Sequence, residues 1–395
     1  MSDLYLFVAD MTGIGGLETL IIKVVDELIR RKRRVVMFGP QGEISQLLHA
    51  SVARIPNFDA GAICREIRSL CGDPPLEITI VSMHPWGLVR ASLLNRALRR
   101  CGYGVRGFHL VSHSRAFFFD TRAPAMRRIL RRAFFRSPRA SSYFMNVAAR
   151  DAHQAFWKTD VSDYPVLTLP LASPSEMWTP SDGPGLRVVS VGRLVPFKGY
   201  NRAAPEVVRS LRDAGIDISW DIWGDGPDRE LIEMDIRRTG VGQWLRLRGV
   251  LSYEEFDREV ARYDLFVGMG TALLEAGRIG MPAITAVEAT THETYGFLHQ
   301  TPLDSVGDRV ADAPTRSLQD VIRAFARLSP NEVVAVGKAC RESALERSSS
   351  VAQVADAMEN AEPWHLDDSD NGWLRIACAI LTLQGLRQTL TGRVS

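Results

Sequence analysis

Short apolar segments alternate with longer amphipathic stretches along almost the whole chain, and no other feature limits the fold as strongly. Apolar residues 4–9 are followed by apolar positions at helical spacing over 17–28, and then by a second apolar segment at 35–39. Two further apolar segments occur at 78–83 and 108–113. Strands that alternate with helices are typical of a parallel sheet with helices on both faces. The sequence therefore predicts an α/β protein.

A stretch rich in proline, serine and glycine, residues 171–185, divides this alternation into two series. Such a composition is typical of a linker. We therefore expect two Rossmann-like αβα domains that face each other across a cleft, one over 1–170 and one over 186–368. An amphipathic pattern near the end predicts a closing helix within 369–395, which we expect to pack back on the N-terminal domain.

Composition excludes several classes of protein. Of the 395 residues, 46% are apolar and 24% are charged, which is unlike a disordered, collagen-like or small disulfide-stapled chain. No apolar run reaches the ~18 residues of a membrane-spanning helix, and the first residues lack the pattern of a signal peptide. The five cysteines are odd in number and form no CxxC pair, so we expect reduced thiols in a cytoplasmic protein and no structural zinc.

Positive charge is concentrated in the first half of the chain. Residues 1–170 contain 24 Lys and Arg against 14 Asp and Glu, whereas the remainder contains 24 against 32, although the net charge is only +2. A basic domain joined to an acidic one suggests that the first domain faces something anionic. We expect an anionic membrane rather than nucleic acid, because no nucleic-acid recognition motif is present and the second domain is acidic.

The basic residues are densest over 115–139, where one helical face is apolar and the other is made of arginine. A basic amphipathic helix is typical of an element that lies on an anionic membrane. The alternative is a helix that packs on the sheet of its own domain and leaves its arginine face in water. The residues that we expect at the membrane or the acceptor are Arg127, Arg128, Arg131, Arg132 and Phe134.

Three loops between a strand and a helix contain the residue types that bind phosphate. Residues 12–18 and 268–276 place glycines directly before a helix, whose free N–H groups and dipole attract anions. Residues 191–199 place Arg193 and Lys198 on one loop, where a guanidinium fork and an ammonium group suit a diphosphate. Each loop also has a simpler interpretation, namely a tight turn for the glycines and solvated cations for the basic loop.

The three loops occur in order within longer stretches of sequence. These stretches are GGLE, VGRLVPFKG, IWGDGPDRELIE, LRGVLSYEEF and DLFVGMGTALLEAGRIGMPAITA. With them the chain resembles the retaining GT-B glycosyltransferases of the large GT4-like group, over nearly its whole length and most strongly over 186–286. The resemblance implies the GT-B fold, with two Rossmann-like domains, and the transfer of a sugar from a nucleotide-sugar donor.

The resemblance also implies roles for individual positions. Arg193 and Lys198 match the pair that neutralises the donor diphosphate, and Glu275 matches the glutamate that binds the ribose hydroxyls. From the residues alone, Glu275 could instead simply pair with an arginine. Catalysis would rest on these three residues and on a histidine that contacts the donor sugar or the acceptor, His113. Three further pairs of residues would contact the donor. The segment at Val250 and Leu251 would cradle the base, and the N-domain loop at Gly15 and Gly16 would close over the phosphates. The backbone amides of Gly270 and Thr271 would bind phosphate.

One position departs from the family pattern. The family has a further glutamate, which contacts the donor sugar, at the place where this chain has Val267. The backbone amides of Gly270 and Thr271 remain as donors to a phosphate or a sugar hydroxyl.

We therefore expect a retaining glycosyltransferase that moves a sugar from a UDP- or GDP-sugar to a lipid-linked or growing bacterial polysaccharide, bound peripherally to the inner face of the cytoplasmic membrane. We expect no cofactor and no metal, because no Asp-x-Asp or His/Asp cluster lies near the phosphate loops. Two alternatives stay open. One is a membrane-associated scaffold without activity, which the valine favours, and the other is a nucleotide-sugar 2-epimerase.

Overall fold

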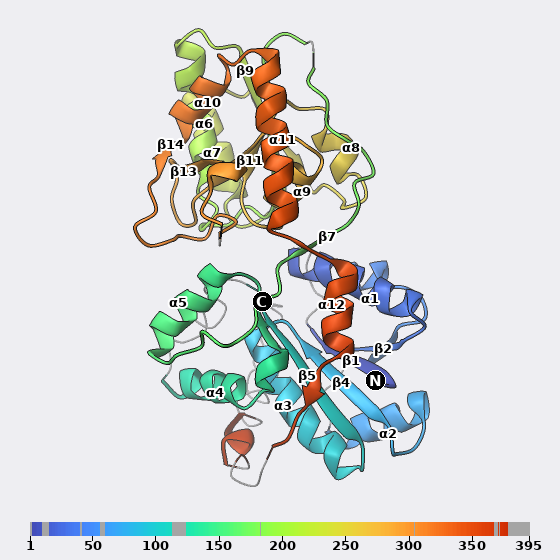
Figure 1. Cartoon of the computed structure of the whole chain (residues 1–395). Helices are drawn as coiled ribbons and strands as arrows, with labels where there is room; N and C mark the ends of the chain where they lie inside the picture. Colours follow the sequence, from blue (N-terminus) through green and yellow to red (C-terminus); the bar gives the residue numbers. More distant parts are fainter. Residues whose placement is uncertain are drawn as a thin grey trace. The chain divides into compact units, whose positions relative to one another are not determined.

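Two α/β units make up the chain, as the computed structural model in Figure 1 shows. Unit 1 comprises Met1–Leu167 and Val351–Ser395, and unit 2 comprises Thr168–Ser350. Each unit contains one seven-stranded, largely parallel sheet, which agrees with the alternation in the sequence. The structure describes residues 2–9, 16–39, 42–55, 60–112, 124–181, 183–303, 305–366, 370 and 372–377.

The sheet of unit 1 is parallel except at one edge strand. Its order is β16-β5-β4-β1-β2-β3, with β6 also paired to β5. Only β16 runs antiparallel to its neighbour among these described pairs. The central strand β1 is buried at all five positions because helices cover both faces. The strands are β1 (Leu4–Val8), β2 (Arg34–Phe38), β3 (Ala53–Ile55), β4 (Glu77–Ser82), β5 (Gly104–Val111), β6 (Ser142–Phe144) and β16 (Glu362–Pro363).

The helices of unit 1 bury apolar stripes against this sheet. The first helix buries the stripe that the sequence predicts, Leu20, Ile21, Val24, Val25 and Leu28. The helices are α1 (Gly16–Arg30), α2 (Ala60–Cys71), α3 (Pro85–Arg100), α4 (Pro124–Phe135), α5 (Val147–Trp157) and α12 (Val351–Glu359), with 3₁₀ turns at Glu43–Leu47 and Arg139–Ser141.

The sheet of unit 2 is parallel in its centre and antiparallel at one side. Its order is β10-β9-β8-β11-β12-β13-β14. The pairs β12–β13 and β13–β14 are antiparallel, and the others are parallel. A separate pair joins β7 (Pro170–Leu171) to β15 (Ser349–Ser350). The main strands are β8 (Leu186–Val191), β9 (Ile218–Trp223), β10 (Leu245–Gly249), β11 (Leu265–Gly268), β12 (Ala283–Ala286), β13 (Glu293–Phe297) and β14 (Arg316–Ser317).

The helices of unit 2 enclose a core that is centred on β8 and β9. Trp220 and Tyr200 are among its largest fully buried side chains. The longest helix of this unit, α11, packs along α9. The helices are α6 (Tyr200–Asp213), α7 (Arg229–Thr239), α8 (Phe256–Val260), α9 (Thr271–Arg278), α10 (Leu318–Phe325) and α11 (Pro330–Glu346), with a 3₁₀ turn at Leu298–Gln300.

After unit 2 the chain returns to unit 1 at residue 351, which is earlier than the expected boundary at 368. The reason is that α12 packs on α1 and pairs with two arginines that directly follow α1. Arg31 donates to Asp356 at 2.6 Å, and Arg33 donates to Glu359 at 2.8 Å. β16 then adds to the edge of the first sheet beside β5.

The helix expected within 369–395 is described only over 372–377. Trp373 and Leu374 of this part belong to the hydrophobic core of unit 1. The indole of Trp373 donates to Asp370 at 2.8 Å, and Arg136 at the end of α4 pairs with the same carboxylate at 3.1 Å. Residues 372–377 therefore pack on the unit that contains the N-terminus.

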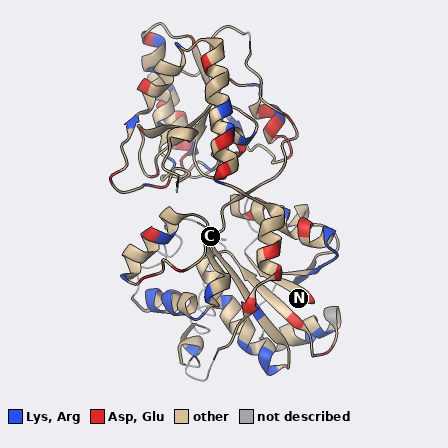
Figure 2. Ribbon diagram, viewed as in Figure 1, with Lys and Arg blue, Asp and Glu red and all other residues tan. Residues whose placement is uncertain are grey.

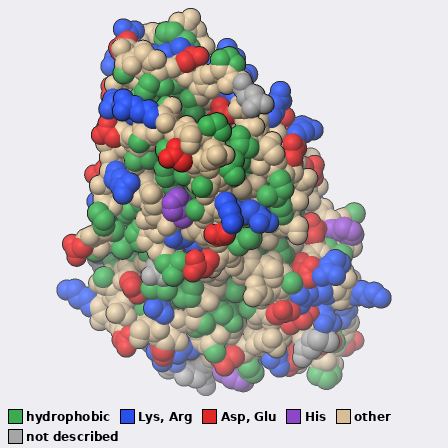
Figure 3. All heavy atoms as spheres, turned by 45° about the horizontal axis from the view of Figure 1, so that its top comes forward, with side chains coloured by type: hydrophobic (Ala, Val, Ile, Leu, Met, Phe, Trp, Pro, Cys, Tyr) green, Lys and Arg blue, Asp and Glu red, His purple; other side chains and the backbone are tan. Residues whose placement is uncertain are grey.

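Basic residues are prominent along the ribbon of unit 1, and α4 contains several of them (Figure 2). On the face that Figure 3 shows, hydrophobic side chains are distributed among polar and charged ones. Within the described ranges, no helix combines the length and the apolar character needed to cross a membrane.

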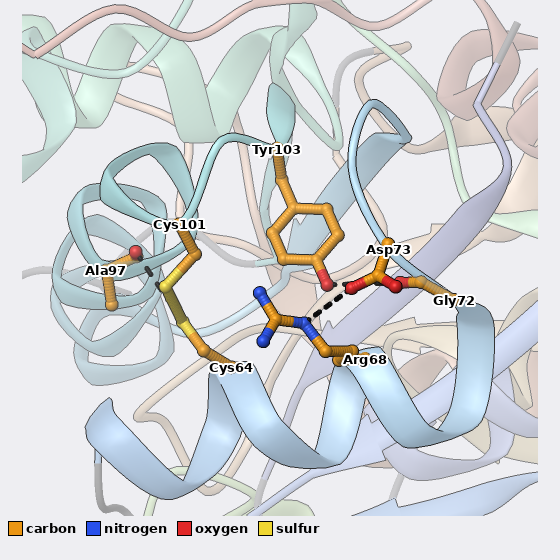
Figure 4. The surroundings of a disulfide bond; sticks show 7 residues. All are labelled: Cys64, Arg68, Gly72, Asp73, Ala97, Cys101 and Tyr103. Atoms are coloured by element: carbon orange, nitrogen blue, oxygen red, sulfur yellow. Dashed lines mark hydrogen bonds and ion pairs between the residues drawn. A yellow bond between two sulfur atoms is a disulfide. The ribbon is translucent and has the colours of Figure 1, made fainter.

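A disulfide joins Cys64 of α2 to Cys101, the residue that caps α3 (Figure 4). The expectation of reduced thiols is wrong for this pair. The two cysteines are 37 residues apart, but α2 and α3 pack together and bring their α-carbons within 6.7 Å, a separation that a disulfide can span. Arg68 of α2 pairs with Asp73 at 2.8 Å on the turn that follows the same helix. Cys340 in unit 2 is buried and free.

Candidate functional site

The loops that follow the parallel strands of unit 2 lie at one edge of its sheet, because parallel strands all end at the same edge. β10, β9, β8, β11 and β12 are consecutive neighbours in this sheet. The fold therefore gathers most of the predicted donor-site residues at this edge. They are Arg193 and Lys198 after β8, Val250 and Leu251 after β10, and Gly270, Thr271 and Glu275 after β11.

The loop after β8 forms backbone hydrogen bonds with the turn after β9. The N–H of Leu194 donates to the carbonyl of Asp225 at 2.9 Å, and the N–H of Asp228 donates back to Leu194 at 3.1 Å. Gly224 is required for this contact, because a β-carbon there would lie 1.9 Å from the carbonyl oxygen of Gly192. The two glycine-containing turns are thus packed backbone to backbone, and the basic loop has a defined conformation.

Arg193 and Lys198 lie on this loop without a counter-charge. In the described part of the chain, neither side chain makes a hydrogen bond or an ion pair with a protein group. The Nζ of Lys198 lies so close to Gly192 that a β-carbon there would be 2.6 Å away. Burial, and secondly the charge of Arg193, lower the pKa of Lys198 to about 8. Two neighbouring cations that the described residues do not neutralise are a candidate site for an anion.

The helix α9 begins beside this loop, because β11 is the neighbour of β8. The first N–H groups of an α-helix have no partner within the helix, so they attract an anion. The N–H of Gly270 donates to the carbonyl of Val306 at 2.7 Å, however. The predicted contact of the Gly270 amide with phosphate is therefore replaced by a contact within the protein. Of the two predicted backbone contacts to phosphate at the start of α9, the contact from the N–H of Thr271 stays a prediction.

A buried arginine positions the segment that binds Gly270. The guanidinium of Arg347 donates to several backbone carbonyls before Val306, and Arg347 is only 7% exposed. These acceptors are the carbonyls of Thr301, Pro302, Leu303 and Ser305, at 2.6 to 3.0 Å. No sequence pattern predicted this role, because a single arginine at the end of a helix carries no sign of its partners.

Glu275 is buried, and both of its oxygens have protein partners. Arg278, one turn later on α9, donates to Oε2 at 2.7 Å, and the hydroxyl of Tyr253 donates to Oε1 at 3.1 Å. Arg278 also donates to Asp257 of α8 at 2.5 Å. Pairing of Glu275 with an arginine, the simpler interpretation, is thus present. No sequence pattern predicted the other members of this cluster, although Tyr253 and Asp257 lie shortly after Leu251 in the chain.

The segment after β10, which also contains Tyr253, exposes apolar side chains. Val250 is 55% exposed, and Leu251 is partly exposed. Val267, where the family pattern has a glutamate, is completely buried in β11. The carbonyl of Val267 accepts a hydrogen bond from the hydroxyl of Ser190 at 2.7 Å in the neighbouring strand. A carboxylate at this position would lie in the sheet interior, so the position lines no site in this chain.

The predicted residues of unit 1 are described only in part. Gly16 is the first residue of α1 and follows β1, as the sequence predicts for a strand–glycine–helix turn. Gly15 and His113 lie outside the described residues. Their roles therefore remain those that the family resemblance implies.

The basic helix α4 packs by its apolar face on unit 1. Phe134 is completely buried. The centroid of its ring lies 4.7 Å from the ring centroid of Trp157 and 5.0 Å from that of Tyr164. The prediction that Phe134 contacts a membrane or an acceptor is therefore wrong, because the ring fills the core. The arginines on the other face, Arg127, Arg128, Arg131 and Arg132, are exposed. The helix thus has the packing of the alternative interpretation, with a cationic face left at the surface.

Comparison with known proteins identifies the architecture. No family model matches the chain, and no curated protein matches its sequence. HepE of Anabaena, solved in complex with UDP and glucose, is 14% identical, with a TM-score of 0.69 over 91% of this chain and 100% of that one. The chain has the GT-B fold.

Two further solved structures show the same likeness, and one of them, WaaG, is a glycosyltransferase. WaaG, which is involved in lipopolysaccharide biosynthesis, is 14% identical, with a TM-score of 0.62 over 91% of this chain and 100% of that one. TarM of S. aureus, as a variant in complex with fondaparinux, α-GlcNAc-glycerol and UDP, is 10% identical, with a TM-score of 0.62 over 91% and 99%. At these identities the likeness concerns the fold.

Proposed function

We propose that the protein is a glycosyltransferase and that unit 2 binds the diphosphate of a nucleotide-sugar donor. The observation that carries this proposal is the pair of cations on the loop after β8. Arg193 and Lys198 have no protein counter-charge among the described residues, and the pKa of Lys198 is depressed by its burial and, secondly, by the positive charge of Arg193. A folded protein keeps such a pair where an anionic ligand supplies the missing charge.

The proposed reaction develops negative charge on the leaving group, and the cations of unit 2 would stabilise it. Cleavage of the bond between the sugar and the diphosphate leaves negative charge on the departing phosphate. The guanidinium of Arg193, the ammonium of Lys198 and the N-terminus of α9 would stabilise this charge without a metal ion. We propose retention of the anomeric configuration, with the leaving phosphate as the base that accepts the acceptor proton, because the family that the sequence resembles is a retaining one.

The nucleoside would lie farther along the same edge. Glu275 is placed on α9 with its carboxylate fixed by Arg278, and would accept hydrogen bonds from ribose hydroxyls. The exposed apolar segment at Val250 and Leu251 would contact the base. We propose UDP as the first nucleotide to test, because the structures of HepE and TarM named above contain it.

The acceptor side is proposed for unit 1. The exposed arginines of α4 form a cationic surface that suits an anionic membrane or a lipid-linked acceptor with a phosphate group. Because the apolar face of α4 is buried in unit 1, this contact would be electrostatic and would not involve insertion of the helix. We propose peripheral binding on this basis.

The deciding experiment is calorimetric titration of the protein with UDP and GDP. We expect one nucleotide to bind, and we expect an Arg193→Ala/Lys198→Ala variant to lose that binding. The matched control is Arg209→Ala on α6, whose exposed side chain pairs with Asp213 at 2.9 Å and lies outside the loop. Failure of both nucleotides to bind would contradict the proposal and favour a scaffold.

Activity is then tested with the UDP-sugars or GDP-sugars of the nucleotide that binds. Formation of a glycosylated acceptor together with release of the nucleoside diphosphate would establish transfer. Assignment of the product anomer by NMR would establish the stereochemistry. Unchanged turnover in EDTA is expected if the protein cations alone stabilise the leaving group. Isomerisation of the free donor without any acceptor would instead identify a 2-epimerase.

A further inference from the structure

The hydroxyl of Tyr253 covers the carboxylate of Glu275. Tyr253 follows β10 in the same segment as Val250 and Leu251, and its Oη lies 3.1 Å from Oε1 of Glu275. The residue Tyr253 is 38% exposed, whereas Glu275 is 2% exposed. The tyrosine therefore lies at the surface while the carboxylate that it bonds is buried beneath it.

The other oxygen of this carboxylate is bound by a buried network of hydrogen bonds, here called the brace. Arg278 donates to Oε2 of Glu275 and to Asp257, and Asp257 accepts two hydrogen bonds from Ser175, from the backbone at 2.8 Å and from the hydroxyl at 3.0 Å. Arg278 and Asp257 are both buried. The brace connects α9, α8 and the segment before β8, and it bonds Oε2 of Glu275 independently of Tyr253.

Tyr253 is a neutral hydrogen-bond donor at all ordinary pH values. Burial of its hydroxyl, followed by the negative charge of Glu275, raises the pKa of Tyr253 well above its usual value. A neutral tyrosine hydroxyl donates one O–H hydrogen bond to an ionised carboxylate, and a sugar hydroxyl does the same. The partner that Tyr253 offers to Oε1 is therefore chemically equivalent to a ribose hydroxyl.

We propose that Tyr253 occupies, in the nucleotide-free protein, the position at Oε1 of Glu275 that a ribose hydroxyl takes when a nucleotide binds. This inference rests on the proposed function, since it requires a nucleotide at this edge of unit 2. Binding then exchanges one O–H donor for another. The exchange keeps the buried carboxylate satisfied in the free protein, and it reduces the net gain from the ribose hydroxyls.

The proposal predicts an unusual direction of effect. Tyr253→Phe leaves Oε1 of Glu275 without this donor in the free protein, so a ribose hydroxyl then contributes its full hydrogen bond to a charged acceptor. UDP should bind about tenfold more tightly to Tyr253→Phe than to the natural protein. The affinity for 2′,3′-dideoxyuridine diphosphate, which brings no hydroxyl, should not increase.

The experiment is calorimetric titration of the full chain and its variants with these two ligands. Tyr263→Phe is the matched control, because the hydroxyl of Tyr263 donates to a different carboxylate, Asp221, at 2.8 Å in the same unit. It should leave the ratio of the two affinities unchanged. Adding Glu275→Gln to Tyr253→Phe should abolish the gain, since the charged acceptor is then absent. Thermal unfolding of each variant checks that the fold is retained.

Three results would overturn the inference, and they differ from failure of the proposed function. Weaker binding of UDP to Tyr253→Phe would make Tyr253 a direct ligand contact. Equal changes for UDP and the dideoxy ligand would make its role one of packing. An unchanged ratio would make it irrelevant to the ribose. In each case the nucleotide still binds, whereas absence of binding to the natural protein would contradict the proposed function and this inference with it.

Discussion

The N–H of Gly270 donates a 2.7 Å hydrogen bond to the carbonyl of Val306, so the residue before α9 is bound by a neighbouring segment of the chain. The N–H of Glu288 donates to the next residue of that segment, Gly307, at 2.8 Å. The segment therefore joins the loop after β12 to the start of α9. The position of the helix N-terminus depends on it, and consequently on Arg347.

We expect Arg347→Met to destabilise unit 2 strongly. The variant leaves several buried carbonyls without a donor, and we expect a loss of about 3 kcal/mol in the free energy of unfolding. Urea unfolding measures this loss. Arg341→Met is the control, because Arg341 lies on the same helix with an exposed side chain and should change stability by less than about 0.5 kcal/mol. Equal stabilities of the two variants would contradict the positioning role of Arg347.

We expect Lys198→Met to stabilise the protein while it weakens nucleotide binding. The fold lowers the pKa of Lys198, which means that it disfavours the charged form, so removal of the charge at pH 7 should raise the free energy of unfolding by about 1–2 kcal/mol. The affinity for UDP should fall at least about tenfold. Unfolding without nucleotide and calorimetry with nucleotide measure the two effects. Lys338→Met, at an exposed lysine of α11, should change neither. A less stable Lys198→Met would show that the lysine is structural.

Nucleotide binding should depend on pH above about 8. The charged form of Lys198 binds the diphosphate, and its pKa of about 8 in the free protein should rise in the complex. The affinity for UDP should therefore fall as the pH rises through 8, by up to about tenfold per pH unit. Binding at pH 8 to 9 should take up protons, which calorimetry in buffers of different ionisation enthalpy detects. The effect should be absent in Lys198→Met, and its persistence there would assign the titration to another group.

Reduction of the Cys64–Cys101 disulfide should destabilise unit 1. The bond closes a loop across a sequence separation of 37, and the chain-entropy model gives a stabilisation of about 4 kcal/mol for such a loop. We expect dithiothreitol to lower the free energy of unfolding by roughly this amount. In a Cys64→Ala/Cys101→Ala variant the reductant should have no further effect. Identical stability of the oxidised and reduced protein would contradict the expectation.

Binding to anionic vesicles should be electrostatic and should depend on α4. Because the apolar face of the helix is buried, we expect high salt to release the protein from vesicles that contain phosphatidylserine. Changing Arg128, Arg131 and Arg132 to glutamate should abolish co-sedimentation, since each cation contributes about 1 kcal/mol near anionic lipid. The control changes three exposed arginines of unit 2, namely Arg209, Arg258 and Arg262. Binding that resists salt would instead indicate insertion of apolar groups.

Features that depend on neighbouring residues were predicted correctly from the sequence. The apolar stripe of α1 and the basic loop around Arg193 and Lys198 are local patterns, and the structure places each in the expected element. The prediction of reduced cysteines failed because α2 and α3 are brought together by packing. The prediction for Phe134 failed because an amphipathic helix has the same pattern whether its apolar face meets a membrane or a protein core.

The sequence by itself determined the alternation of strands and helices, the positions of the loops at the carboxyl ends of strands, and the residue types on those loops. These properties follow from side-chain periodicity and turn propensity, which act over a few residues. Only the tertiary structure decided that Gly270 is bound by Val306, that Val267 lies inside the sheet, and that Glu275 is shared between Tyr253 and Arg278. Contacts of this kind depend on how separate elements pack, and packing brings together groups whose sequence neighbours carry no sign of the partner.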